Sequence, residues 1–542
     1  RDYFYAGSFL VWAIWIGMGA FSIIDYFSKQ KFTTAIAAGL LAVSVIAVPV
    51  NMAAGGGKIH SRAGNYLPFD YSYNILQSCE PNAILFTYGD NDTFPLWWLQ
   101  DVAGVRRDVR VVNLSLGNTL WYVDQAKNRQ PWGADKIPLS FENRTIQLTD
   151  EADPYALSYS EGDPEVISFK VKPEIMKQYT NDPVVLSNGT FTFTFSGQNL
   201  GTRNNKPVYR FRVQDKLVAD IIKNVKFERP VYFSTTVSPD NFVGLDNFLR
   251  LEGMAFKICP VPQKNTQYEA INLEIMEKCL ISGVDNTNDY SPTARYGFKF
   301  RNLNNPSVYY DEVHRRLMSS YRSLYVTYAS QMLLLKKDNA KAIQVIEKMN
   351  DLISPIQFPM AYDLEYRVAK ILFDAGAKDK AQPYIDMGIK SCNEIIQNRK
   401  LAPDAVLMEA SSRYLGPHRY ASMMYEMKGN YAEAKMVLEN LKQYAEALLA
   451  EVKAYGNASE TQQVEMNILD IVANINNLDL SEIEAKEGPK AALDKAISKL
   501  KQIMQNNNAS DQATFNFLLR KIDELKLKTG DTISYETLLS QG

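Results

Sequence analysis

The stretch "ILFTYGDNDTFPLWWLQ", residues 84–100, decides the fold, because it joins an apolar run to a polar turn and then to paired tryptophans. The run "AILFTY" (83–88) is short, apolar and rich in strand-forming residues, as is typical of a buried strand. The segment "PLWWLQDVAG" (95–104) has helical length, begins with proline and ends in glycine. We therefore expect a strand, a turn and a helix here.

A second strand follows the helix within a few residues, since "DVRVVNLSL" (108–116) is another short apolar run. A strand, a helix and a strand with short connections form a βαβ unit, and its two strands pair in parallel. Residues 89–93 then lie between the carboxyl end of a parallel strand and a helix N-terminus. Open α/β sheets bind ligands at that position.

The polar residues of this turn, with the tryptophans beside them, are candidates for ligand binding. Two carboxylates two residues apart suit a cation or a sugar hydroxyl, although the further acids of a dedicated calcium loop are missing. An exposed indole face is a platform for sugars, whereas a buried one is core. In the alternative interpretation, Asp92 or Thr93 caps the helix and Asp90 shapes the turn. The candidates are Asp90, Asn91, Asp92, Thr93, Trp97 and Trp98.

Two uncharged stretches near the start, residues 3–24 and 32–57, are each long enough to cross a membrane as a helix. The short loop between them carries Lys29 and Lys31, which favours a cytoplasmic loop and places everything after residue 57 outside the cytoplasm. Lys58 and Arg62 favour the opposite orientation. The chain opens with "RDYFY" rather than with Met and a basic region, so we expect further sequence upstream.

The remainder divides into a β-rich part and a helical part. "TFTFTFSG" (190–197) alternates apolar and polar residues, whereas "DKLVADIIKNV" (215–225) has helical spacing, so we expect an α+β region. After residue 309 three helix breaks recur, at Lys337, Gly376 and Gly429, each followed five residues later by an alanine, which is typical of tetratricopeptide-like (TPR-like) hairpins. Such repeats bind another protein or brace their own chain.

The predicted fold is thus multidomain: two transmembrane helices, an α/β (βαβ) unit, a β-rich α+β region and an all-α TPR-like repeat domain. The expected ranges are 1–57, 58–135, 136–308 and 309–542.

Composition excludes several classes of function. Lys and Arg number 59 against 61 Asp and Glu, so no basic field exists to attract nucleic acid. Four cysteines without a C-x-x-C pair and only three histidines predict no metal site, and no cofactor is evident. A disulfide between Cys259 and Cys279 is open at this stage.

Two motifs resemble a known family. "NAILFTYGDNDTFPLWWLQDVAGVRRDVRVVNLSLGNTLWYVDQ" (82–125) and "RPVYFSTTVSPDNFVGLDNFLRLEG" (229–253) look like the carboxyl-terminal half of large polytopic membrane proteins of Bacteroidetes-type bacteria. The membrane part of that family resembles GT-C glycosyltransferases and protein O-mannosyltransferases. The resemblance extends over nearly the whole chain.

This resemblance implies a bacterial inner-membrane protein whose residues after about 57 lie in the periplasm, with a polyprenyl-linked sugar as donor. The catalytic acid of such enzymes lies in an early loop that we expect upstream, so no catalytic residue is carried over. His60 and Arg62 are further ligand candidates, since the family has a His-Asp-Arg run there, although Ser61 replaces its acid.

Two functions of different classes follow. In the first, the chain is the substrate-facing part of a membrane glycosyltransferase that modifies protein, with the lipid bilayer and an acceptor held by the helical repeats as partners. In the second, it is a membrane-anchored periplasmic scaffold of an envelope complex.

Overall fold

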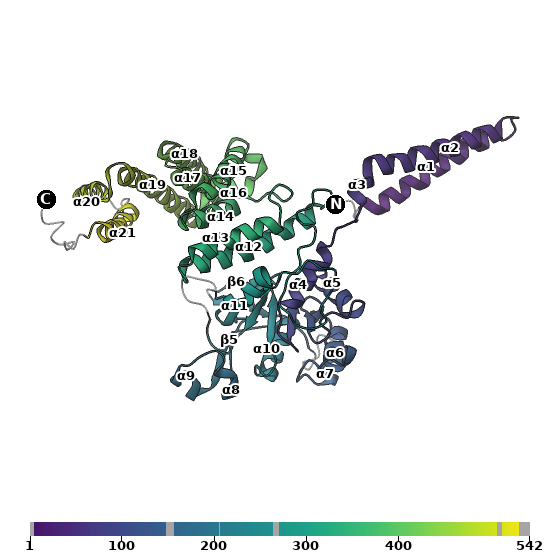
Figure 1. Cartoon of the computed structure of the whole chain (residues 1–542), viewed down its shortest axis with the longest axis horizontal. Helices are drawn as coiled ribbons and strands as arrows, with labels where there is room; N and C mark the ends of the chain where they lie inside the picture. The colour runs from purple at the N-terminus through teal and green to yellow at the C-terminus, as the bar shows by residue number, and fades with distance from the viewer. Residues whose placement is uncertain (1–4, 148–156, 205, 264–269, 507–511, 531–542) are drawn as a thin grey trace.

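The computed structural model describes residues 5–147, 157–204, 206–263, 270–506 and 512–530. It contains two N-terminal apolar helices, a mixed α/β region with sheets and an all-helical C-terminal region, as the sequence predicts. The helical hairpin projects away from the rest of the molecule, and the α/β region lies against one end of the helical region (Figure 1).

The hairpin consists of α1 (Ala6–Tyr26) and α2 (Thr33–Asn51), which continues through a π-helical turn, η2 (Met52–Gly56), into α3 (Gly57–His60). The two helices, Ala6–Tyr26 and Thr33–Gly56, are long and apolar enough to cross a membrane. No residue of their most apolar segments is buried within the protein. Helices whose apolar side chains are not packed in a protein core are expected where the helices face lipid. The first predicted residues of the hairpin, 1–4, lie outside the described residues.

The α/β region is organised around a five-stranded sheet of order β2-β1-β8-β10-β9. Strand β1 pairs in parallel with β2 on one side and with β8 on the other, while β10 is antiparallel to both β8 and β9. The predicted βαβ unit with parallel strands is therefore confirmed. The strands are β1 (Ile84–Thr87), β2 (Arg110–Asn113), β8 (Val231–Ser234), β9 (Leu249–Glu252) and β10 (Ala255–Ile258).

Helices cover both faces of this sheet. On one face, side chains of α4 (Leu67–Gln77) and α5 (Asp90–Asp101) pack with Leu85 and Tyr232 in a single core. On the other face, α6 (Leu120–Asn128) and α10 (Val213–Val225) pack against a second core that contains Phe86. Since β1 and β2 come from the predicted range 58–135 and β8–β10 come from 136–308, the two ranges share one sheet.

The chain between β2 and β8 forms smaller sheets. Strand β5 (Thr190–Phe195) pairs with β4 (Glu165–Lys170), and its three phenylalanines are buried at alternate positions, as the alternating sequence predicts. Strands β3 (Ser160–Gly162), β6 (Gln198–Arg203) and β7 (Lys206–Phe211) form a three-stranded sheet. The short helices of the whole α/β region are η3 (Leu116–Asn118), η4 (Pro131–Gly133), α7 (Asn143–Gln147), α8 (Pro173–Met176), α9 (Pro183–Asn188), η5 (Pro239–Asn241), η6 (Asp246–Phe248), α11 (Leu273–Glu277) and η7 (Lys278–Ser282).

The four cysteines are all free and buried, so the open question of a disulfide between Cys259 and Cys279 is answered in the negative. Burial raises the pKa of the Cys259 thiol to about 12 and that of Cys279 well above its usual range. These cysteines therefore pack as small apolar residues rather than as reactive thiols.

The helical region is built from consecutive helices that pack as hairpins. The predicted breaks are turns in which Lys337, Gly376 and Gly429 all adopt the left-handed backbone conformation, with φ of 56°, 88° and 77°. The alanines that follow, Ala342, Ala381 and Ala434, are all fully buried. The helices are α12 (Glu312–Leu334), α13 (Asn339–Leu352), α14 (Tyr362–Asp374), α15 (Lys378–Gln397), η8 (Arg399–Leu401), α16 (Pro403–Ser411), α17 (Pro417–Met427), α18 (Tyr431–Tyr455), α19 (Ala458–Glu487), α20 (Pro489–Asn506) and α21 (Gln512–Thr529).

At the third break, Gly429 and Ala434 have different structural roles. Ala434 belongs to a buried cluster with Ala410, Leu438 and Ile471. Around Gly429, in contrast, a Cβ atom would meet nothing within 4 Å. Gly429 is therefore required by the turn, which needs a positive φ, and not by the approach of two helices.

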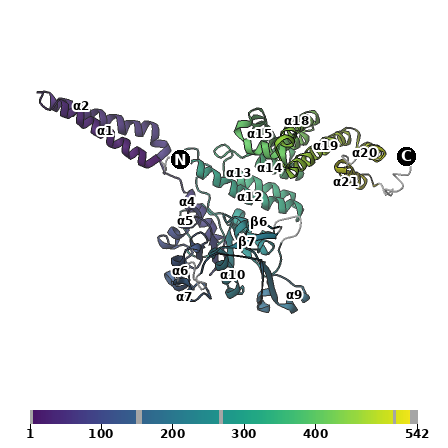
Figure 2. The same ribbon diagram turned by 180° about the vertical axis from the view of Figure 1, so that it is seen from behind.

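Helix α12 joins the helical region to the α/β region, and Figure 2 shows it lying between them from the opposite side. The Tyr325 hydroxyl donates to the carbonyl oxygen of Leu280 at 2.9 Å, and the Asn74 amide donates to the Tyr321 hydroxyl at 2.8 Å. Both tyrosines belong to the same core as α4. The first helices of the repeat region thus brace their own chain.

We predict that Ala434→Leu overpacks the contact between α18 and its neighbours and lowers the free energy of unfolding by roughly 1–3 kcal/mol. The matched control is Ala432→Leu, because Ala432 is exposed on the same helix and surface changes cost less than about 0.5 kcal/mol. Urea unfolding of the full chain in detergent, followed by circular dichroism, measures both. Equal unfolding of the two variants would contradict the packing assigned to Ala434.

Candidate functional site

The acidic stretch after β1 opens a helix instead of forming a loop. Helix α5 begins at Asp90, with Gly89 as its N-cap, so the predicted start at Pro95 is wrong and this proline lies inside the helix. The reason is local: the Asp92 carboxylate accepts the backbone N–H groups of Gly89, at 2.8 Å, and of Tyr88, at 3.1 Å. A carboxylate at the third helical position that satisfies the N–H groups before the helix stabilises an earlier start.

Asp92 also ties two strands together. The Thr236 hydroxyl, just after β8, hydrogen-bonds the Asp92 carboxylate and lies 2.8 Å from the Ser234 hydroxyl. The chain runs from β1 to β2 on one side of β1 and later returns to β8 on its other side. The carboxyl ends of β1 and β8 therefore form the topological switch point of the sheet. The bond from Asp92 to Thr236 bridges the crevice where such sheets usually bind ligands.

Thr93 takes part in a second set of bonds at the same strand ends. Its buried hydroxyl lies 2.7 Å from that of Thr87 and 2.6 Å from the carbonyl oxygen of Gly89, and it accepts the Asn113 amide at 2.8 Å. All of its hydrogen-bonding capacity is used within the protein. Thr93 is therefore a structural link between β1, α5 and β2.

The other candidates of this stretch point in different directions. Asp90 and Asn91 are exposed, and neither side chain makes a hydrogen bond or ion pair with any described residue. Trp98 is 43% exposed, contacts Phe69 edge-to-face at 4.6 Å, and lines an apolar hollow of about 310 Å³. Trp97 is half-buried on another side of α5. The tryptophans thus face separate surfaces, as neighbouring positions on a helix do, and the ligand role of the acids stays a prediction.

His60 and Arg62 lie where the N-terminal helical hairpin connects to the α/β region. The Arg62 guanidinium donates to the carbonyl oxygen of Ile59 at 3.1 Å and lies 3.9 Å from the carboxylate of Asp311, at the start of α12. The ring of His60 lies against Gly56. Their described contacts connect the hairpin to α12 and not to the acids of α5.

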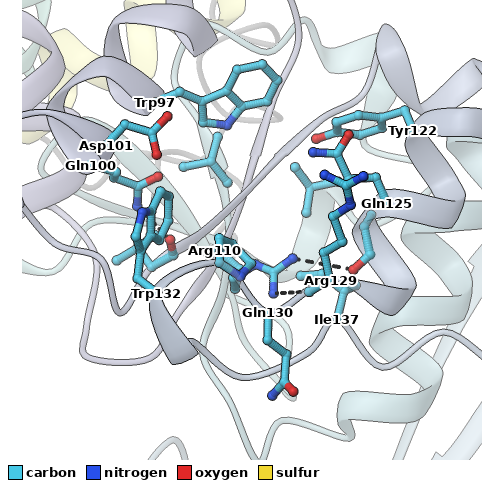
Figure 3. A pocket seen from close by; sticks show the side chains of 15 residues that line it. Trp97, Gln100, Asp101, Arg110, Tyr122, Gln125, Arg129, Gln130, Trp132 and Ile137 are labelled. Atoms are coloured by element: carbon cyan, nitrogen blue, oxygen red, sulfur yellow. Dashed lines mark hydrogen bonds between the residues drawn. The ribbon is translucent and has the colours of Figure 1, made fainter.

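A pocket of about 550 Å³ opens at the free edge of β2. Helix α5 forms one wall, α6 forms another, and the turn around Pro131 forms the rim (Figure 3). Of the predicted candidates, only Trp97 lines it. The lining residues are Trp97, Gln100, Asp101, Val109, Arg110, Val111, Val112, Tyr122, Gln125, Ala126, Arg129, Gln130, Pro131, Trp132 and Ile137.

The guanidinium of Arg110 lies at the centre of this pocket in Figure 3. It donates to the carbonyl oxygens of Arg129 and Asp135, at 3.1 and 3.0 Å, and burial lowers the pKa of Arg110. No carboxylate of the described residues lies within ion-pair distance of it. Carbonyl dipoles orient this cation without neutralising it, so the pocket carries a buried positive charge.

Sequence reasoning missed this pocket because its walls come from separate elements. One local signal was available, the "RQPWG" turn at residues 129–133, where a tryptophan stands between proline and glycine. Trp132 has φ 53°, a left-handed conformation that costs a residue with a side chain about 1–3 kcal/mol and that clusters at functional sites. A buried arginine without a counter-charge cannot be recognised before the fold is known.

The comparison with protein families bears on this same region. Residues 68–196 and 202–275 match the model of one family. The α/β region matches TMEM260-associated domain 2. TMEM260 is a membrane protein family related to protein O-mannosyltransferases. The TMEM260-associated match contains the whole five-stranded sheet and the pocket, and it includes neither the hairpin nor the helical repeats.

Two further comparisons gave no relatives: no curated protein and no solved structure matches the chain significantly.

We predict that Asp92→Asn lowers the free energy of unfolding by about 0.5–2 kcal/mol, because a single amide oxygen cannot accept from Gly89, Tyr88 and Thr236 together. Asp90→Asn is the matched control, with an expected change below about 0.5 kcal/mol. Thermal unfolding of both variants in detergent measures the difference. If Asp90→Asn were the more destabilising of the two, the assignment of Asp92 as the structural carboxylate would be wrong.

Proposed function

We propose that this chain is the extracytoplasmic, substrate-facing part of a membrane glycosyltransferase of the GT-C kind, which transfers sugar from a polyprenyl-linked donor to protein. In this proposal the protein resides in a bacterial inner membrane, and the residues after about 57 lie in the periplasm. The chain itself contributes binding and positioning, and no catalytic residue is assigned within it.

The match of the α/β region to a TMEM260-associated domain is the single observation that carries this proposal, because TMEM260 is related to protein O-mannosyltransferases. The connection to the membrane supports it. Only residues 61–66 separate the end of α3 from the start of α4, and six residues span at most roughly 20 Å. If the hairpin spans a bilayer, the α/β region is held close to its surface.

The helical region would hold the acceptor protein. Its first helix, α12, packs against the α/β region, since Tyr321 and Tyr325 belong to the core that the two regions share. The later helices contribute to two separate small cores, and in the outer one α20 and α21 pack against the end of α19. Helical repeats that the rest of the chain does not cover present a long surface to other proteins.

That same region favours the second candidate function, a membrane-anchored scaffold of an envelope complex. Under this alternative the helical repeats assemble partner proteins, the hairpin is an anchor, and no sugar transfer depends on the chain. The two candidates differ in what is lost when the protein is removed.

We predict that cells without this protein lose sugar from a defined set of extracytoplasmic proteins, and that the full-length protein restores it. Mass spectrometry of glycopeptides from three strains, the parent, the deletion and the complemented deletion, measures this. An unchanged glycopeptide profile, together with the dissociation of an envelope complex on native gels, would refute the transferase role and support the scaffold.

A further inference from the structure

The pocket at the edge of β2 has the charge of an anion-binding site. Arg110 is buried and Arg129 is exposed at the mouth, whereas Asp101 is the single acidic residue of the lining. Among the described residues, no carboxylate lies within ion-pair distance of either arginine. A buried guanidinium that lacks a carboxylate partner is costly in the empty protein, and an anionic ligand offsets that cost.

The back wall of the pocket offers one backbone donor and one backbone acceptor. The N–H groups of Arg110 and Leu114 donate to β1 and its flanks, at 2.8 Å each, so the alternate residues 109, 111 and 113 face the free edge of the strand. Val111 lines the pocket, and in the described part of the chain nothing bonds its N–H and C=O groups at this edge.

The edge on either side of Val111 is closed by side chains. The Asn113 N–H donates to the Tyr122 hydroxyl at 2.8 Å, and the carbonyl oxygen of Val109 accepts the Gln100 amide at 2.7 Å. A peptide that adds a strand to a sheet needs successive open residues along the edge. With one open residue between two closed ones, the edge excludes an extended polypeptide and suits a compact ligand.

Aromatic rings surround this polar back wall. Trp97 and Tyr122 lie with ring centroids 6.3 Å apart, and Trp132 stands at the rim, on the other side of Arg110 from Tyr122 (Figure 3). The Arg107 guanidinium lies 5.7 Å from the centre of the Trp132 ring, which helps to hold the indole in place. Burial raises the pKa of the Tyr122 hydroxyl to about 12, so it remains a proton donor at physiological pH.

These features together select a class of ligand. Indole and phenol faces pack against the apolar face of a sugar ring, while amides and backbone groups pair with hydroxyls, which both donate and accept. Gln125 and Gln130 are among the lining residues, and both are exposed. A volume of about 550 Å³ lies within the range of small-molecule sites.

We propose that the pocket between α5, α6 and the Trp132 turn binds a small acidic sugar, with its carboxylate or phosphate on Arg110 and Arg129 and its ring against Trp97 and Trp132. This inference deepens the proposed function, on which its biological setting rests, by naming the class of sugar that the α/β region recognises. Its chemistry stands on the pocket alone, so a binding measurement without turnover tests it separately.

The test is isothermal titration of the purified full chain in detergent with four probes. Glucuronate and glucose 1-phosphate carry the two anionic groups, glucose carries none, and inorganic phosphate has no ring. We expect at least one acidic sugar to bind about ten-fold or more tightly than both glucose and phosphate, and the tighter of the two identifies the anion. Equal binding of glucose, equal binding of phosphate, or no binding of either acidic sugar would overturn the proposal.

Substitutions test whether the sugar binds in this pocket. Trp132→Ala at the exposed rim is expected to weaken it about ten-fold, and Arg110→Gln to remove the preference for the acidic over the neutral sugar. Trp98→Ala is the matched control, because Trp98 lies on α5 outside the pocket. Should Arg110→Gln fail to fold, Trp132→Ala still tests the site. Unchanged binding of the acidic sugar to the Trp132→Ala variant would contradict the site. Equal weakening by Trp98→Ala and Trp132→Ala would also contradict it. Acidic-sugar binding with unchanged glycopeptides in the deletion strain would leave this inference standing and refute the proposed function.

Discussion

The parallel pairing of β1 with β2 on one side and with β8 on the other is the constraint on which the rest of the structure depends. Parallel crossovers are right-handed, so moving from β1 to β2 and then back past β1 to β8 puts the connecting helices on opposite faces of the sheet. Helices α5 and α10 accordingly belong to different cores.

That topology creates a switch point at the ends of β1 and β8 and leaves β2 as an edge. The switch point and the free edge of β2 differ in what surrounds them. Asp92, Thr93 and Thr236 fill the switch point with bonds inside the protein. At the edge, α5 and α6 stand apart far enough to leave a pocket around Arg110. At the switch point, Asp92 and Thr93 are thus engaged within the protein, while the ligand role predicted for Asp90 and Asn91 stays a prediction, and the pocket at the edge of β2 is a second candidate site.

The parts of the fold that depend on local sequence could be predicted. Apolar runs with short connections identify the βαβ unit, and glycine or lysine breaks followed by alanine identify the helical hairpins, because turn geometry and close packing each restrict nearby residues. The start of α5 was placed too late, because Pro95 is typical of a first helical turn, whereas the Asp92 carboxylate accepts the N–H groups of Tyr88 and Gly89 and the helix begins at Asp90. The membership of β8, β9 and β10 in the same sheet was also missed, because periodicity carries no information on which strands pair.

The candidate site divides in the same way. The sequence identified a strand end with acids and tryptophans, and Trp97 does line the pocket. Its other lining residues come from β2, α6 and the turn at Trp132, and only the crossover brings them together with α5. The charge of Arg110 becomes informative once its burial and its carbonyl partners are known, and neither is a property of sequence spacing.

The proposed function requires that the α/β region, with its pocket, lies outside the cytoplasm at the end of a membrane-spanning hairpin. Labelling of single introduced cysteines in intact spheroplasts with a membrane-impermeant thiol reagent tests this most directly. Ser28 lies in the exposed hairpin loop and Ser140 on the exposed surface of the α/β region, while the four native cysteines are buried and do not compete. We expect Ser140→Cys to be labelled in intact spheroplasts and Ser28→Cys to be labelled only after detergent is added. Labelling of Ser28→Cys with protection of Ser140→Cys would contradict it.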